Sequence, residues 1–411
     1  MAIRVDMRQV VLVIASAVDL VGVDDVLHGR RVAVIAAECA RRLRWGRERR
    51  NLVFDAGLIH DCGVSSTRVR RHLVDELDWE GAHEHCELGR DLLVDFPPLA
   101  PLAPIILHHH THWDRLGETD LTPEARLHAN LVFLADRVDV NAAPHYADDS
   151  LLLHIAEIRN LIDRHRGVHF APELVEAFLA ASLAESFWLA LDADFLPQEV
   201  AAMGCDPQER TIGLGELRAL GLIIARIVDA KSHFTTDHSL GVARLATFLA
   251  GRVGIAGDHL ERVEVAALLH DIGKLQIPDE VLESRDRLTP EGRALMKKHS
   301  FATWQILRRI GGFEEIARWA SEHHESLDGG GYPFRFLAGD LPLESRIIKV
   351  ADIYQALAQT RPYRGPMAAS DILNILRGMQ AAQSVDPGVV DVVSRHLEEC
   401  HAAAVGANRV G

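Results

Sequence analysis

An internal repeat constrains this 411-residue chain more than any other feature. The segment LIHDCG begins at Leu58, and the similar segment LLHDIG begins at Leu268. In both halves a histidine precedes the His-Asp pair by 32 residues, and a histidine, a His-His pair and an aspartate follow it at offsets of 214 to 216 residues between the halves. Chance does not readily produce one ordered series of residue types twice, so we expect two tandem copies of one domain.

The periodicity of the apolar residues predicts an all-α fold. In segments such as RVAVIAAECARRL from Arg31 and VARLATFLAGRV from Val242, apolar residues return every three or four positions. Few segments alternate with a period of two, which strands would require. Proline and glycine among polar residues near 197–215 indicate a connector. We therefore expect two helical bundles with the domain order 1–197, a linker 198–215, 216–402 and a tail 403–411.

Composition limits the partners and the location. The chain has 59 acidic and 44 basic residues, a formal charge of −15, which argues against binding long nucleic acids but not against a small anionic ligand. Five dispersed cysteines without a CxxC pair indicate neither a disulfide framework nor a zinc ribbon, and they fit a cytoplasmic location. No apolar run reaches the roughly 18 residues of a membrane span. A cleaved signal sequence is the alternative for the apolar run 10–18, which the repeat instead makes structural.

Much of the chain's high content of 23 histidines belongs to a repeated set of candidate metal ligands. Nitrogen and carboxylate ligands suit iron, manganese, nickel or zinc, and seven are too many for one tetrahedral ion. Two ions that share a bridging carboxylate would use them all. A packing role is the alternative for any single histidine, but it does not explain the repeated order. In the second copy the set is His238, His270, Asp271, His299, His323, His324 and Asp352.

Longer motifs in the second copy carry a family resemblance. They are LLHDIGK from Leu268, LTPEGRALMKKHS from Leu288, HHESLDGGGYP from His323 and ADIYQAL from Ala351. Residues from about 220 to 400 resemble the HD-GYP subgroup of HD-domain metal phosphohydrolases, which typically hydrolyse the bacterial messenger cyclic di-GMP. The resemblance implies a signalling phosphodiesterase that opens a cyclic dinucleotide, with cyclic di-GMP first in order, to a linear dinucleotide or to GMP. The copies would then be tandem HD-type domains.

The same resemblance assigns roles to the candidate ligands. It implies two divalent ions, iron or manganese before nickel or zinc, with Asp271 as their bridge. His238, His270 and Asp352 would complete one site, and His299, His323 and His324 the other. Phe234 stands where some members carry a third-ion glutamate, so two ions are expected. Lys274 resembles a lysine that contacts a substrate phosphate. A water shared by the two ions would lose its proton near neutral pH and attack phosphorus.

Other positions of the motif concern the substrate and partner proteins. The loop residues Asp328, Gly329, Gly331, Tyr332 and Pro333 resemble a segment beside the site, and a partner protein could contact it. The family's two guanine-contacting aspartates are replaced here, and serine and glutamine offer a base a mixed donor and acceptor pattern. The alternatives are a binding module without turnover and a phosphohydrolase for another nucleotide; a homodimer is a further option. The candidate substrate contacts are Lys274, Ser232, Gln355, Arg361 and Arg364.

The first copy keeps the ligand series but not the rest of the motif. Val64 takes the position of Lys274, and Gly117-Glu118-Thr119 takes that of Gly331-Tyr332-Pro333. We expect a diverged, regulatory HD domain; independent hydrolysis and histidines retained for packing are the second and third alternatives. Its candidate metal site consists of His28, His60, Asp61, His85, His109, His110 and Asp136.

Overall fold

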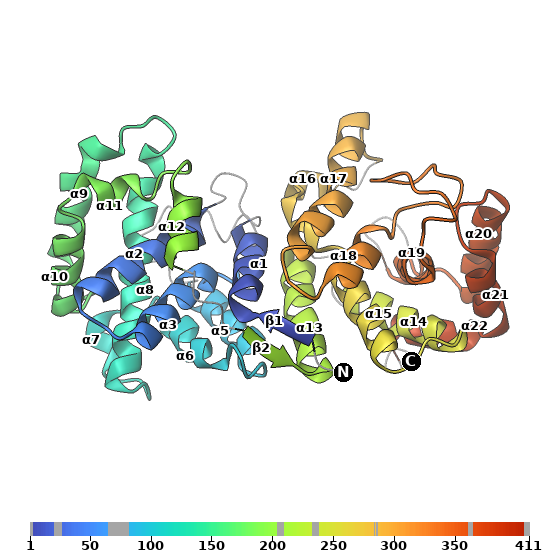
Figure 1. The fold of residues 1–411 in the computed structure, drawn as a ribbon, viewed down its shortest axis with the longest axis horizontal. Helices are drawn as coiled ribbons and strands as arrows, with labels where there is room; N and C mark the ends of the chain where they lie inside the picture. Colours follow the sequence, from blue (N-terminus) through green and yellow to red (C-terminus); the bar gives the residue numbers. More distant parts are fainter. Residues whose placement is uncertain are drawn as a thin grey trace. The chain divides into compact units, whose positions relative to one another are not determined.

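The structure, a computed structural model, confirms the all-α prediction. It describes residues 3–19, 27–64, 82–203, 209–231, 238–282, 284, 287–360 and 365–406. Helices make up most of this part of the chain (Figure 1). Within the described ranges, the two strands β1 (Ile3–Asp6) and β2 (Glu209–Ile212) pair in a small sheet. No described helix is long and apolar enough to cross a membrane.

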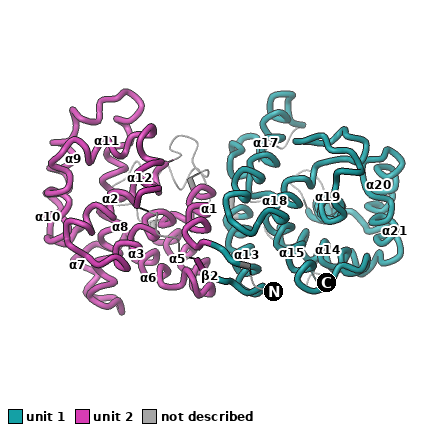
Figure 2. The backbone as a smooth tube through the Cα atoms, viewed as in Figure 1, with its two compact units in different colours: residues 1–5, 210–411 teal, residues 6–209 magenta. Residues whose placement is uncertain are grey.

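The chain divides into two compact units (Figure 2). Residues 6–209 form one, here called the N-terminal unit, and residues 1–5 with 210–411 form the C-terminal unit. The segment 198–215, expected as a linker, contains the end of α12 (Leu196–Met203), β2 and the start of α13 (Leu214–Lys231).

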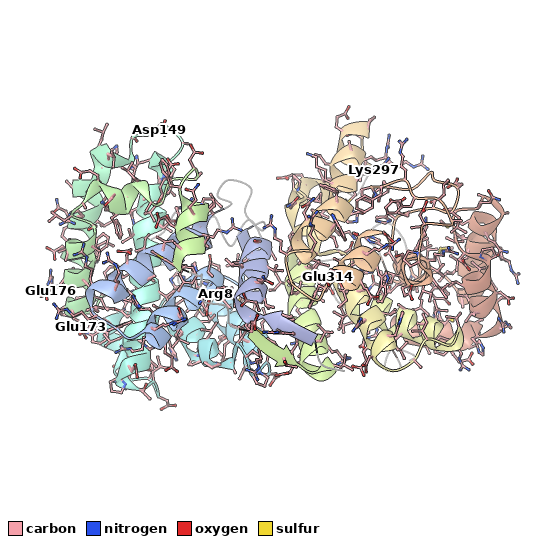
Figure 3. The ribbon with its side chains drawn as sticks, in the orientation of Figure 1. Arg8, Asp149, Glu173, Glu176, Lys297 and Glu314 are labelled. Carbon is pink, nitrogen blue, oxygen red and sulfur yellow. The ribbon has the colours of Figure 1, made fainter. Side chains whose placement is uncertain are left out.

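In the N-terminal unit, α2 packs against α3, α8, α10 and α12. The apolar run 10–18 lies in α1, where Val10 and Ile14 are fully buried. Arg8 on this helix (labelled in Figure 3) is 2% exposed. It pairs with Asp55 at 2.7 Å and lies over the Phe54 ring. Besides α12, the elements of this unit are α1 (Met7–Asp19), α2 (His28–Arg42), α3 (Arg47–Ile59), α5 (Ala82–Leu93), η1 (Ala100–Leu102), α6 (Ala103–His108), α7 (Trp113–Leu116), α8 (Pro123–Ala142), η2 (Ala143–His145), α9 (Leu151–Arg164), α10 (Pro172–Ala181) and α11 (Glu185–Leu189).

In the C-terminal unit, α14 packs against α15, α19 and α22. Thr289 caps α17 by accepting a hydrogen bond from the backbone of Gly292, and Pro290 follows at the first helical position. Besides α13, the elements are α14 (His238–Arg252), α15 (Asp258–Leu269), η3 (Ile272–Gln276), α16 (Asp279–Leu282), α17 (Pro290–Leu307), α18 (Glu314–Ser321), α19 (Leu343–Ala358), α20 (Ala369–Ala381), α21 (Pro387–Arg395) and α22 (Leu397–Val405).

The repeat is visible in the helices that carry the candidate ligands. In each unit the first histidine begins a helix, α2 or α14, and the His-Asp pair directly follows the next helix, α3 or α15. The third histidine lies within α5 or α17, and the last aspartate lies within α8 or α19. Corresponding helices therefore present corresponding side chains in both units.

Candidate metal centre

Backbone carbonyls orient the histidine rings of the C-terminal unit. Nδ1 of His270 donates to the oxygen of Ala267 at 2.7 Å, and Nδ1 of His323 donates to the oxygen of Ala320 at 2.6 Å. His299 makes the same bond to a carbonyl three residues earlier. Because the ring proton is used at Nδ1, the lone pair of Nε2 faces the cluster, as in metal-ligating histidines.

Asp271 lies between two groups of ligand atoms. Its Oδ2 is 3.2 Å from Nε2 of His270 and 3.7 Å from Nε2 of His238. Its Oδ1 is 3.7 Å from Nε2 of His299 and 3.9 Å from Nε2 of His323. Each carboxylate oxygen therefore faces a different pair of imidazoles, which is the geometry that a bridging ligand requires.

All seven side chains predicted as ligands in the second copy converge here. His238, His270 and Asp352 form one group, and His299, His323 and His324 form the other; within each group the ligand atoms lie within 4.8 Å of one another. Oδ1 of Asp352 is 3.3 Å from Nε2 of His238. These positions come from five separate segments of the chain, so the fold brings the set together.

The chemistry of this set fits divalent cations. Nε2 of His270 and Oδ1 of Asp271 are buried and have no hydrogen-bond partner among the described residues. A buried polar atom without a partner is costly, and cations inside both groups would satisfy these atoms. Burial also lowers the pKa of His299 to about 4 and that of His324 to about 3, which keeps these two imidazoles neutral and able to bind a metal.

The charge of Asp271 is held by its neighbours. Burial alone would raise its pKa, but the neighbouring His270 imidazole and the Lys274 ammonium hold the pKa well below its usual range. The ammonium of Lys274, in η3, donates a hydrogen bond to Oδ2 of Asp271, and the lysine side chain is 25% exposed. The lysine therefore lies at the solvent side of the cluster, where it can meet an anion.

Two glycines that the sequence analysis did not single out allow the close packing behind these ligands. A Cβ on Gly273 would lie 1.9 Å from the backbone oxygen of His299. The equivalent Gly63 has the same contact, at 2.0 Å from the oxygen of His85. The available signal was the glycine that follows both His-Asp pairs in the repeat.

The loop after His324 is fixed by a buried glutamate. Glu325 is 1% exposed, and its carboxylate accepts hydrogen bonds from the backbone nitrogens of Phe334, Arg335 and Phe336 at 2.6 to 3.2 Å. The ring of Tyr332 lies 4.8 Å from the ring of His324. The loop therefore lies directly against the candidate metal-ligand cluster.

The other predicted loop residues serve its turn and its close packing. Asp328 accepts a hydrogen bond from the nitrogen of Gly330, and Gly329 has a φ of 76°, in the left-handed region that favours glycine. A Cβ on Gly331 would lie 2.4 Å from the Cα of Glu325. Pro333 follows Tyr332 through a cis peptide bond.

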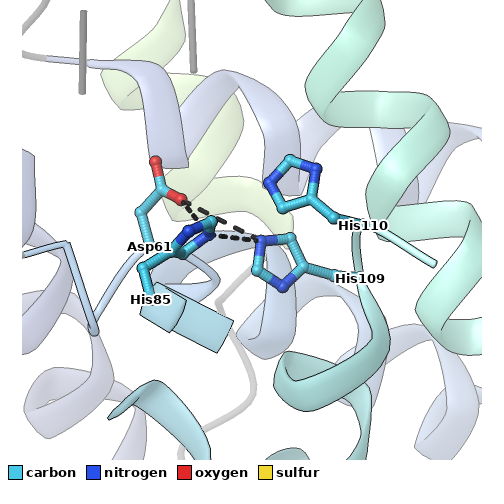
Figure 4. Close-up of side chains that lie close together, drawn as sticks. All are labelled: Asp61, His85, His109 and His110. Atoms are coloured by element: carbon cyan, nitrogen blue, oxygen red, sulfur yellow. Dashed lines mark hydrogen bonds and ion pairs between the residues drawn. The ribbon is translucent and has the colours of Figure 1, made fainter. Parts of the chain in front are cut away.

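The N-terminal unit assembles its own seven residues in a similar way. Oδ1 of Asp61 is 3.6 Å from Nε2 of His85 and 4.0 Å from Nε2 of His109 (Figure 4). Oδ1 of Asp136 is 3.2 Å from Nε2 of His28. The grouped residues are Asp61, His85, His109 and His110 on one side and His28, His60 and Asp61 on the other.

Comparison with known proteins identifies the family. HD domain models match residues 222–389 and 26–141. The 3′3′-cGAMP-specific phosphodiesterase 1 of Vibrio cholerae is 36% identical over 411 residues, which cover 98% of this chain and 94% of that protein. The chain belongs to the HD-GYP family of HD-domain proteins.

Further HD-GYP relatives match parts of the chain. The 3′3′-cGAMP-specific phosphodiesterase 3 of the same organism is 31% identical over 299 residues, 71% of this chain and 62% of that protein. The cyclic di-GMP phosphodiesterase response regulator RpfG of Xanthomonas campestris is 33% identical over 174 residues, 42% of this chain and 46% of that protein. The crystal structure of the V. cholerae cyclic GMP-AMP specific phosphodiesterase V-cGAP3 shares the fold, with a TM-score of 0.62, 24% identity and 98% of each chain covered.

The candidate substrate contacts of this HD-GYP protein are only partly described. Gln355 is 2% exposed, and its amide nitrogen donates to the backbone oxygen of Ala404 at 3.1 Å. A Cβ on Gly241 would lie 2.1 Å from this amide nitrogen, so glycine makes the space for it. Gln355 thus takes part in packing between α14, α19 and α22. Ser232, Phe234, Arg361 and Arg364 lie outside the described residues.

Proposed function

We propose that the C-terminal unit is a metal-dependent phosphodiesterase that hydrolyses a cyclic dinucleotide, with 3′3′-cGAMP as the preferred substrate. The observation that carries the proposal is the position of Asp271 between two histidine groups, with Lys274 beside it on the solvent side. The sequence analysis placed cyclic di-GMP first. The relative that matches almost the whole chain is named for 3′3′-cGAMP, and this supports the changed order.

The proposal assigns the ligands as two sets around one bridge. Asp271 belongs to both sets; His238, His270 and Asp352 complete the first, and His299, His323 and His324 complete the second. Two divalent ions, iron or manganese before nickel or zinc, suit these nitrogen and oxygen ligands. Such ions, when bound, supply an activated water and stabilise the charge that develops on the phosphoryl oxygens.

The chain's own cations bind the substrate phosphates. Lys274 is held by Asp271 at the solvent side of the cluster, where its ammonium pairs with a non-bridging oxygen of the phosphate under attack. Lys297 is exposed on α17 (Figure 3), and its ammonium lies 5.4 Å from the centre of the Tyr332 ring. Because that ring contacts His324, Lys297 is suitably placed at the rim of the site for the second phosphate of a cyclic dinucleotide.

The replacement of the family's two guanine-contacting aspartates supports a substrate that does not carry guanine at both positions. A carboxylate accepts two hydrogen bonds from the edge of guanine, whereas a glutamine amide both donates and accepts. Gln355 already donates its amide hydrogen to Ala404 within the unit. Loss of the guanine-contacting carboxylates at positions 232 and 355 therefore fits a substrate with one adenine better than one with two guanines.

Turnover measured by chromatography tests the proposed function. The full chain loaded with Mn²⁺ or Fe²⁺ should hydrolyse 3′3′-cGAMP with a higher kcat/KM than cyclic di-GMP. Asp271→Ala should abolish turnover, and Lys274→Ala should lower kcat by about 100-fold, the usual effect of removing one transition-state contact. The matched control is Lys298→Ala, an exposed lysine of α17 outside the ligand set, which should leave turnover unchanged.

Two results would contradict this assignment. Activity retained in Asp271→Ala would refute the bridging role. Loaded protein that binds both dinucleotides without hydrolysing either would favour a binding module. A cytoplasmic location, homodimer formation and contact with signalling proteins through the loop 328–333, here called the GYP loop, stay predictions.

A further inference from the structure

The N-terminal unit contains one group of four candidate metal ligands. All ligand atoms of Asp61, His85, His109 and His110 lie within 4.8 Å of one another (Figure 4). His85 and His109 are at most 2% exposed, and Nδ1 of His109 donates to the oxygen of Ile106 at 2.6 Å, so its Nε2 faces the cluster. Three imidazoles and one carboxylate are a full set for a single ion.

The spacing of these atoms also fits one central ion. Nε2 of His85 and Nε2 of His109 are 3.3 Å apart. Two nitrogens that each lie about 2.1 Å from one tetrahedral ion are roughly 3.4 Å apart. Nε2 of His109 presents its lone pair, because Nδ1 holds the ring proton, so a cation can be bound there together with Nε2 of His85.

The remaining candidate ligands of this unit, His28, His60 and Asp136, lie beside buried arginine side chains. Oδ2 of Asp136 accepts hydrogen bonds from Nε and Nη2 of Arg137 at 3.0 and 2.8 Å, and Arg137 is 2% exposed. A buried guanidinium this close compensates the charge of the carboxylate and repels a second cation. In the C-terminal unit the residue that follows the corresponding aspartate is Ile353, which brings no charge.

A second arginine, Arg31, acts through Asp139 on His28, the first histidine of this half. Nδ1 of His28 is 2.7 Å from Oδ2 of Asp139, a contact that would otherwise strengthen His28 as a ligand. Oδ1 of Asp139, however, accepts hydrogen bonds from Arg31 and Tyr146, each at 2.7 Å. The C-terminal unit has Gly241 and Gln355 at the positions of Arg31 and Asp139, so this charged pair is specific to the N-terminal unit.

We propose that the N-terminal unit binds one divalent ion through Asp61, His85, His109 and His110, and that Arg137 prevents a second ion from binding at His28, His60 and Asp136. The ion has a structural or ligand-sensing role, because Val64 replaces the phosphate lysine and is 2% exposed. This inference concerns the N-terminal unit and does not depend on turnover in the C-terminal unit.

Reconstitution of the full chain with Mn²⁺ alone tests the proposal. Elemental analysis should find about three ions per chain, and electron paramagnetic resonance should show the sextet of an isolated Mn²⁺ beside the coupled signal of a bridged pair. His85→Ala and, as a milder change, His110→Gln should each remove one ion and the sextet. His299→Ala, the matched change in the C-terminal unit, should leave the sextet.

Each part of the proposal can fail separately. A sextet and metal content unchanged in both His85→Ala and His110→Gln would show that this set binds no ion. About four ions in the wild type, or two lost in His85→Ala, would overturn the single-ion assignment. Arg137→Met should admit one more ion, and an unchanged count in a folded Arg137→Met protein would refute the role of Arg137. Metal content is measurable whether or not the protein hydrolyses a dinucleotide.

Discussion

Replacing Gly273 by alanine should damage the C-terminal site through the backbone. The new Cβ would lie 1.9 Å from the oxygen of His299 and 2.8 Å from the nitrogen of Thr303, whereas ordinary contact begins at 3.4 Å. Neither atom belongs to a flexible side chain, so α17 would have to withdraw by roughly 1.5 Å. Overpacking of this kind costs about 1–3 kcal/mol, and a 1 Å displacement of an active-site group can lower turnover about 100-fold.

Thermal unfolding and dinucleotide turnover, measured on the same preparations, would check this expectation. In a unit of this size, each kcal/mol lowers Tm by about 2–4 °C. Gly251→Ala is the matched control, because it lies in α14 with no atom within 4 Å of its Cβ position. Gly63→Ala should lower stability by a similar amount but spare the C-terminal ligands. Equal stability and turnover in Gly273→Ala and Gly251→Ala would refute the steric argument.

Three further outcomes are expected. Glu325→Gln should raise KM and lower Tm, because a neutral amide holds the backbone nitrogens that directly follow the GYP loop less strongly; an unchanged KM would contradict this positioning role. Lys297→Ala should raise KM several-fold with little change in kcat, and added salt should reduce the difference if the contact is ionic. Burial lowers the pKa of Lys349 from 10.5 to about 8, so the unfolded chain binds more protons between these values. Urea unfolding should therefore show the wild type gaining stability from pH 8 to 10.5 relative to Lys349→Met, and parallel pH profiles would refute this.

The helical fold and the grouping of the candidate ligands in space were predictable from the sequence. Apolar periodicity specifies which face of a helix is buried, and it does so locally. The repeat added long-range information, because two copies of one ordered series imply the same spatial arrangement. For this reason residues as far apart as His238 and Asp352 could be grouped before their 3.3 Å separation was known.

Contacts without a local pattern were not predictable. Position 273 requires glycine because of the backbone of His299, which lies 26 residues later in the sequence, and no sequence rule connects the two positions. Gln355 was expected at the substrate, yet its amide nitrogen bonds to Ala404 on a helix that follows nearly 50 residues later. Pairing of Arg137 with Asp136 depends on rotamers within one helix turn, which charge patterning alone does not specify.

Carbonyl oxygens three residues before the histidines suggest how the two copies could diverge so far. Nδ1 of His60 and Nδ1 of His270 each donate a hydrogen bond to the carbonyl oxygen of the third preceding residue, Gly57 or Ala267. His109 and His323, the first histidines of the two His-His pairs, do the same. Every amino acid has this acceptor, so the orientation of these rings survives substitution of the residue that supplies it. Mutations can therefore accumulate around the rings and give one copy a new role while the inherited ligand geometry persists.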